Sequence, residues 1–190
     1  WENGGGSRSA RKRRMEGASS MRSILAVTVA ALLAAADPAV AAGKSAACKP
    51  LFAAMEKVAL TDHALRIVRD GKSSESITAG GVIYVQVRGA WKASPMTAQD
   101  MLAQQRENIR TARAYDCTPL GDAMVNGVNA HTYRAHTEAA DGDPVSDATI
   151  AIAAGSGLPL HTDEDIKSSG TPMHLSIDYR YDGIRAPIAR

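Results

Sequence analysis

The C-terminal part of the chain contains three segments in which apolar and polar side chains alternate. In 173–181, MHLSIDYRY, every second side chain is apolar or aromatic, and 148–154 and 158–162 alternate on either side of a GSG turn. Side chains two apart on a strand point to the same face, so these segments predict antiparallel strands with one buried and one solvated face. Gly155 and Gly157 suit the turn because glycine adopts positive φ at little cost.

A helix is predicted to begin at Lys49 and to end before Thr61-Asp62. Pro50 suits the first helical turn, and apolar side chains follow it at helical spacing. His63–Arg69, HALRIVR, is predicted as a short strand with a hairpin turn at Asp70-Gly71-Lys72 behind it.

The strongest strand signal lies in Ser76–Trp91, where Ile and Val alternate with Tyr, Gln and Arg. Gly80-Gly81 before the alternation and Gly89 after it are interpreted as turn or bulge positions. Ser94-Pro95 is predicted to stop the strand, since proline cannot donate a hydrogen bond to a neighbouring strand.

A second helix is predicted over 97–114, because Thr97 followed by Asp100 has the spacing of a helix N-cap. Behind it, Pro119-Leu120-Gly121-Asp122 is interpreted as a turn, and Asn126-Gly127 is the best short hairpin signal in the chain. The order helix, hairpin, helix and then a meander of about five strands predicts an α+β fold with an antiparallel sheet.

The segment that starts at Met21 has the three parts of a secretory signal. Arg22 is the charged part, 24–36 is an apolar run of 13 residues, and Ala39-Val40-Ala41 is a cleavage motif. Since a bilayer span needs about 20 residues, we expect 21–41 to be cleaved and 42–190 to form a single α+β periplasmic domain without stable membrane insertion. An uncleaved anchor is the alternative.

Residues 1–20 show no apolar periodicity and hold five basic residues between Arg8 and Arg14. Such a cluster can be a nucleic-acid or nuclear-targeting patch. Its place directly ahead of a complete signal favours a spurious or disordered N-terminal extension instead, with Met21 as the true initiator.

The charge of the predicted domain argues against a nucleic-acid partner. The chain has 22 basic and 20 acidic residues, and six of the basic but only three of the acidic ones lie in 1–41. The remainder is therefore close to neutral and has no basic field that would attract nucleic acid or anionic lipid.

The chain has two cysteines, Cys48 and Cys117, and both lie behind the predicted signal. In an exported protein this count predicts one disulfide between them. Two alternatives stay open at this stage: a pair of buried free thiols, since Cys48 also fits the apolar stripe of the first helix, and a lipid-modified Cys48.

No catalytic motif is present, so we do not predict an enzyme. None of the five histidines belongs to an HxH or HExxH pattern, and a metal site needs three or four converging ligands, so neither a metal nor another cofactor is expected. Asp163-Glu164-Asp165 places its carboxylates on alternating faces and is interpreted as a solvated strand end rather than an acid–base pair.

Four short pieces of sequence carry a family resemblance. They are YVQVRGAWKASP at 84–95, NGVNAHTYR at 126–134, AGSGLPLH at 154–161 and HLSIDYRYDGI at 174–184, behind a signal peptide and a helix. Together they resemble the periplasmic lipoprotein-carrier superfamily (LolA/LolB-like). The resemblance implies a curved antiparallel β-sheet (half-barrel) packed against two or three helices, with an apolar cavity for acyl chains.

The leading hypothesis is therefore a soluble periplasmic binding protein that holds the acyl chain of a lipid or lipoprotein, or another apolar ligand. The candidate lining residues are the apolar side chains of the predicted strands: Leu65, Ile67, Ile83, Val85, Val87, Ile150, Ile152, Leu175 and Ile177. For each of them, packing on the helices without a cavity is the alternative.

A second hypothesis is an envelope protein-interaction or structural domain without a small-molecule ligand. An exposed apolar patch, or an unpaired sheet edge at His63–Arg69 completed by a strand of a partner, would favour it.

Overall fold

The computed structural model describes residues 46–169 and 172–188, which belong to one compact unit, 38–190. The predicted signal peptide and N-terminal extension lie outside the described residues. The elements are, in chain order, a 3₁₀ turn at Ala46–Cys48, α1 Lys49–Ala59, β1 His63–Arg69, β2 Lys72–Ala79, β3 Val82–Val87, β4 Ala90–Thr97, α2 Ala98–Thr111, β5 Ala114–Val125, β6 Val128–Glu138, β7 Val145–Ala153, β8 Pro159–Lys167 and β9 Met173–Arg180.

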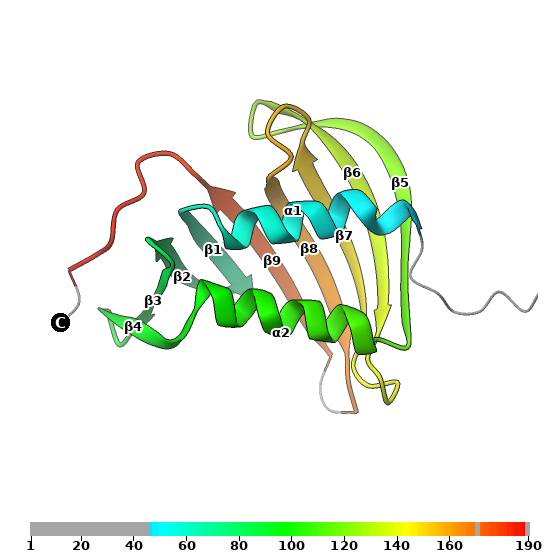
Figure 1. Ribbon diagram of the computed structural model, residues 1–190, viewed down its shortest axis with the longest axis horizontal. Coiled ribbons are helices and arrows are strands. Elements are labelled where there is room, and N and C mark those ends of the chain that lie inside the picture. The colour runs from blue at the N-terminus through cyan, green and yellow to red at the C-terminus, as the bar shows by residue number, and fades with distance from the viewer. Residues whose placement is uncertain (1–45, 170–171, 189–190) are drawn as a thin grey trace, which may run out of the picture. The chain divides into compact units, whose positions relative to one another are not determined.

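All the strands belong to one open sheet, in the order β4-β3-β2-β1-β9-β8-β7-β6-β5, and every neighbouring pair is antiparallel. The sheet is curved, and α1 and α2 lie on the same side of it (Figure 1). This confirms the predicted α+β class with a curved antiparallel sheet, packed in the described part of the chain against two helices. We call the covered side the helix-side face and the opposite side the outer face.

Both helices begin where their local sequence predicts. Pro50 occupies the first turn of α1, and Leu51 and Ala54 point into the core. The first turn of α2 is closed by a capping box, in which the Asp100 backbone N–H donates to Thr97 Oγ1 at 3.1 Å and the Thr97 N–H donates to an Asp100 carboxylate oxygen at 2.9 Å. The helix ends at Thr111, before the predicted 114, because Ala114 already belongs to β5.

The segment predicted as one strand, Ser76–Trp91, contains the end of β2, all of β3 and the start of β4. Gly80-Gly81 and Arg88-Gly89 are tight turns with positive φ, so the chain reverses inside the predicted element. The prediction that Ser94-Pro95 stops the strand is also wrong, because β4 runs on to Thr97. As an edge strand, β4 can accommodate a proline that donates no hydrogen bond.

The turn predicted at Pro119-Leu120-Gly121-Asp122 lies inside β5. The register between β5 and β6 shifts between Pro119 and Gly121, and Gly121 has a φ of 104°, so the four residues form a bulge rather than a reversal. The reversal comes at Asn126-Gly127, as predicted, with φ values of 53° and 78°.

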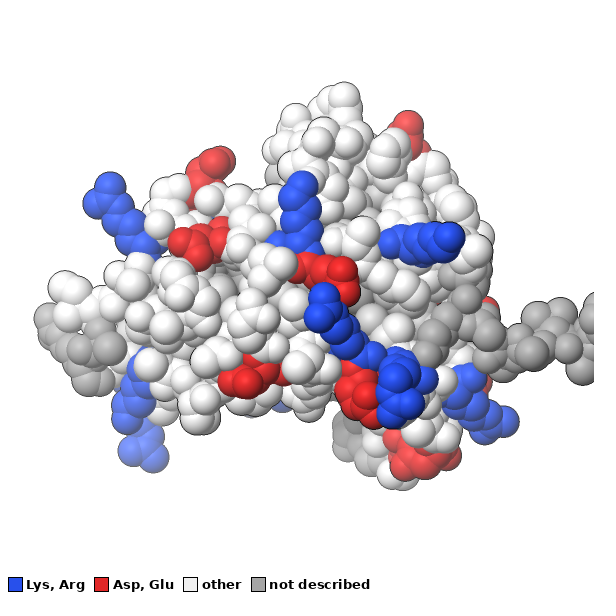
Figure 2. Space-filling model, in the orientation of Figure 1, with Lys and Arg blue, Asp and Glu red and all other residues white. Residues whose placement is uncertain are grey.

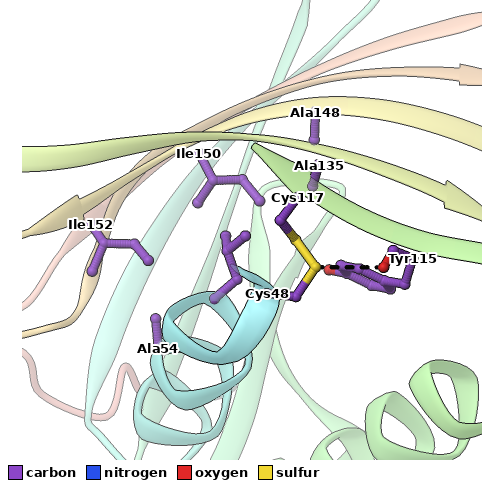
Figure 3. Close-up of a cluster of buried hydrophobic side chains, with 9 residues drawn as sticks. Cys48, Ala54, Tyr115, Cys117, Ala135, Ala148, Ile150 and Ile152 are labelled. Atoms are coloured by element: carbon purple, nitrogen blue, oxygen red, sulfur yellow. Dashed lines mark hydrogen bonds between the residues drawn. A yellow bond between two sulfur atoms is a disulfide. The ribbon is translucent and has the colours of Figure 1, made fainter. Parts of the chain in front are cut away.

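The main core lies where α1 meets β5, β6 and β7. Cys48 and Cys117 form the predicted disulfide, so in this structure neither sulfur is a free thiol. Figure 3 shows the bond joining the start of α1 to β5, with Tyr115 beside it. The buried side chains around it are Leu51, Ala54, Tyr115, Ala135, Ala148, Ile150 and Ile152.

Candidate functional site

A cavity of about 210 Å³ lies between α1 and the helix-side face of the sheet. Its wall on α1 and α2 consists of Leu51, Ala54, Met55, Val58 and Gln105. Its floor on the strands consists of Tyr115, Ala135, Thr137, Ser146, Ala148, Ile150, Pro159, Thr162, Glu164, Ile177 and Tyr179. Most of the strand residues in the floor are small, which leaves room beneath the helix.

A second hollow, of about 170 Å³, lies between the two helices. Its lining is Phe52, Met55, Glu56, Leu102, Gln105, Arg106 and Ile109. Met55 and Gln105 line both hollows, so the groove between the helices and the cavity below them adjoin at these two side chains.

The groove has a charged rim. Arg106 of α2 and Glu56 of α1 form an ion pair at 2.9 Å that joins the two helices. Figure 2 shows this helix-covered side of the molecule, where basic and acidic side chains are interspersed and no field of one sign dominates. Because both side chains are about half exposed, the pair contributes little to stability, about 0–1 kcal/mol.

The cavity floor contains one carboxylate, Glu164 of β8, together with the phenols of Tyr115 and Tyr179. Burial, and then the negative charge of Glu164, raise the pKa of Tyr115 to about 12. Burial also raises the pKa of Tyr179. The hydrogen bond to Thr162 lowers this pKa by less than burial raises it, and the charge of Glu164 adds a smaller increase. Both phenols are therefore neutral donors near pH 7.

Register places the nine predicted lining residues on the helix-side face, but only two of them line the cavity. Ile67, Ile177, Thr162 and Ile150 stand opposite one another across β1, β9, β8 and β7, and of these Ile150 and Ile177 lie in the cavity wall. Ile152 packs in the main core. The rest are spread over the remaining part of the sheet and do not line the cavity: Leu65, Ile67, Ile83, Val85, Val87 and Leu175.

The sequence pattern missed Tyr115 and Glu164, although a signal for each was present. Tyr115 stands two residues before Cys117 and so shares the face that the disulfide ties to α1. Glu164 has the parity of the buried Thr162. The three carboxylates at 163–165 do alternate between faces, as predicted, but Glu164 lines a cavity and is not part of a solvated strand end.

The outer face of the sheet carries histidine–carboxylate pairs. His136 Nδ1 lies 2.8 Å from Asp147, His174 Nδ1 lies 3.0 Å from Asp165, and His161 Nδ1 lies 2.8 Å from Asp178. The hydrogen bond to Asp147 raises the pKa of His136, and the hydrogen bond to Asp165 raises the pKa of His174. These pairs stand side by side on neighbouring strands, and each histidine has its own carboxylate.

Other features of the described residues add no second candidate site. In 46–169 and 172–188, no group of three or more His, Cys, Asp or Glu side chains converges as a metal site would require. No helix within those ranges is long and apolar enough to cross a bilayer. A larger hollow of about 480 Å³ on β1, β2 and β9 has a mixed lining, in which Leu65, Ile77 and Tyr179 stand beside four charged side chains, Arg66, Glu75, Asp178 and Arg180.

Comparison with protein-family models finds no matching family, and comparison with curated proteins finds no match either. Comparison with solved structures does find neighbours. The lipoprotein LppX of Mycobacterium tuberculosis is 10% identical with a TM-score of 0.47, the alignment covering 73% of this chain and 100% of that one. LprF of Mycobacterium bovis is 11% identical with a TM-score of 0.41, covering 77% and 96%.

A putative outer membrane lipoprotein-sorting protein domain of Vibrio parahaemolyticus is 8% identical with a TM-score of 0.24, covering 72% of this chain and 93% of that one. Of these neighbours, LppX is described as a lipoprotein and the Vibrio parahaemolyticus protein as a putative lipoprotein-sorting domain. Each TM-score is below 0.5, and none of the matches assigns a function to this chain.

Proposed function

We propose that this protein is an exported binding protein that holds a single acyl chain, or another narrow apolar ligand, in the cavity beneath α1 and α2. The observation that carries the proposal is the cavity beneath α1, with a second hollow between the helices that adjoins it at Met55 and Gln105. An apolar groove that opens between two helices and ends over a sheet gives a chain both an entrance and a place to lie. The function is binding, without a reaction step.

The size of the cavity favours a ligand with one chain. Small-molecule sites typically measure about 300–1,000 Å³, and the cavity of about 210 Å³ and the adjoining hollow of about 170 Å³ are each smaller than that. A lipid or lipoprotein partner would insert one acyl chain and keep the rest of the molecule outside the groove. Placing this function in the periplasm rests on the signal segment at 21–41 and on the disulfide, which suits an oxidising compartment.

The alternative of an interaction domain loses one of the two features that would have favoured it, the unpaired edge at β1. β1, His63–Arg69, is paired with β2 on one side and with β9 on the other, so it offers no free edge to a partner strand. The edges of the described sheet are β4 and β5 instead.

The test is a pair of matched tryptophan substitutions on the helices. Met55→Trp places an indole at the junction of the two hollows, whereas Met101→Trp makes the same change at a side chain that is 50% exposed on α2 and lines neither hollow. We expect Met55→Trp to weaken binding of a neutral apolar fluorophore, N-phenyl-1-naphthylamine, more than about tenfold, which corresponds to about 1.4 kcal/mol.

Met101→Trp should bind the fluorophore as the unsubstituted protein does. Thermal unfolding of both variants shows whether each is folded, since overpacking costs about 1–3 kcal/mol. Equal affinities of two folded variants, or no binding by the unsubstituted protein, would contradict the proposed site.

A further inference from the structure

The Glu164 side chain is the one carboxylate that lines the cavity, and it is half-buried. Its neighbours along β8, Asp163 and Asp165, point to the outer face, where each lies within hydrogen-bond distance of a histidine, at 3.1 and 3.0 Å. Because side chains alternate along a strand, Glu164 alone of the three is turned toward the helices.

Glu164 has no partner of opposite charge in its surroundings. Among the residues that the structure describes, its carboxylate makes neither a hydrogen bond nor an ion pair. The nearest cation along the same cross-strand row is Arg69, which lies two strands away beyond Leu175 and forms no ion pair with it. The other polar groups of the cavity are neutral: the phenols of Tyr115 and Tyr179, hydroxyls and the Gln105 amide.

A half-buried carboxylate has lost part of its contact with water, and a donor on a ligand can replace that contact. Removing an ionised group from water costs free energy unless it is hydrogen-bonded or paired. A carboxylate offers two oxygens that only accept hydrogen bonds, so a matching ligand must donate. A cationic donor would recover the largest part of this free energy, because charge-assisted hydrogen bonds are about twice as strong as neutral ones.

We propose that the ligand of this cavity is a cationic amphiphile, a single hydrocarbon chain that carries an amine group, and that Glu164 binds the amine while the apolar wall binds the chain. This inference rests on the proposed function and adds the chemical class of the ligand. The same carboxylate acts against anionic chains, since two like charges in a cavity repel each other, and so it selects against a free fatty acid.

Three probes of equal chain length test the assignment at pH 7: dodecylamine and dodecanoate below their critical micelle concentrations, and dodecanol below its solubility limit. Their affinities are measured by displacement of N-phenyl-1-naphthylamine. We expect dodecylamine to bind most tightly and dodecanoate least, with about a 10- to 100-fold difference, as is typical of a hydrogen bond to a charged group.

Glu164→Gln keeps the size of the side chain and removes its charge. In this variant dodecylamine should lose most of its advantage, and dodecanoate should gain. Glu164→Lys should reverse the order. Asp165→Asn is the matched control: it removes a carboxylate from the next residue on the outer face and should leave the order of the three probes unchanged.

The outcomes separate this inference from the proposed function. If the three probes bind equally well and Met55→Trp abolishes their binding, the carrier function stands and the amine assignment is wrong. If Asp165→Asn changes the order as much as Glu164→Gln does, the preference comes from overall charge and the assignment is again wrong. If none of the probes binds, both proposals fail.

Discussion

On the outer face of the sheet, Asp147, Asp165 and Asp178 are each hydrogen-bonded to a histidine of a neighbouring strand. On the helix-side face, Glu164 lies in a cavity and has no such partner among residues 46–169 and 172–188. The three outer-face carboxylates are paired within the protein, whereas the Glu164 oxygens remain available to accept a hydrogen bond. The proposed ligand site is therefore on the helix-side face.

The two faces also differ in what stabilises them. The helix-side face contains the disulfide and the main core, with Cys48 and Leu51 fully buried. The paired side chains of the outer face are exposed by roughly a third to two thirds. We therefore expect changes on the helix side to cost much more free energy of unfolding than changes on the outer face.

The largest expected effect is loss of the disulfide. Cys48 and Cys117 are 69 residues apart in sequence, and a loop of that length gives the cross-link about 4 kcal/mol in the chain-entropy model. The double substitution Cys48→Ala with Cys117→Ala should lower the free energy of unfolding by about that amount, measured by urea denaturation. An unchanged unfolding midpoint would show that the disulfide does not hold α1 to β5.

Truncation of the buried face of α1 should have the next largest effect. Leu51 is fully buried beside the disulfide, so Leu51→Ala should cost about 3 kcal/mol in the free energy of unfolding. Leu60→Ala is the control, because Leu60 is 65% exposed and its truncation should change stability by less than about 0.5 kcal/mol. Equal effects of the two substitutions would contradict the position of the core.

The smallest effect concerns the outer face and depends on pH. The hydrogen bond to Asp147 raises the pKa of His136, so its stabilisation is present below the ordinary histidine pKa and is lost as the pH rises through the folded value. The same bond lowers the pKa of Asp147, so that contribution is present above the ordinary carboxyl pKa and is lost in acid. The pair should therefore stabilise the fold most between about pH 4 and 6.5.

We expect His136→Gln to cost up to about 1 kcal/mol at pH 5.5 and close to nothing at pH 9, because the partners are largely solvated. A double-mutant cycle with Asp147→Asn, followed by urea denaturation at the two pH values, isolates the pair. A coupling energy that is the same at both pH values would mean that the pair does not titrate in this range.

The sequence predicted some elements to the residue and misplaced others, for a physical reason. β1 has its predicted bounds, His63–Arg69, and the reversal before β6 falls at the predicted Asn126-Gly127, because strong turn signals flank these strands. β4 and β5 were misjudged because Pro95 and Pro119 were interpreted as breaks. Both prolines lie in edge strands, where the missing N–H donor costs nothing, and edge position is a property of the whole sheet.

The candidate site was predicted only in part for a similar reason. Alternation along a strand identifies the face on which a side chain lies, and by register the nine nominated residues share the helix-side face. It does not show where the helices cross that face. The cavity is lined by two of the nominated residues, Ile150 and Ile177. It is also lined by Tyr115 and Glu164, which the sequence did not nominate.

The most direct test of a ligand site beneath the helices is methyl NMR of the protein labelled with ¹³C at its methionine methyl groups. Met55 lines both hollows, while Met101 and Met124 are 50% and 71% exposed and line neither. Titration with dodecylamine should shift the Met55 signal saturably and leave the signals of Met101 and Met124 in place. A Met55 signal that stays unchanged, or that moves no more than the other two, would contradict a ligand site between the helices and the sheet.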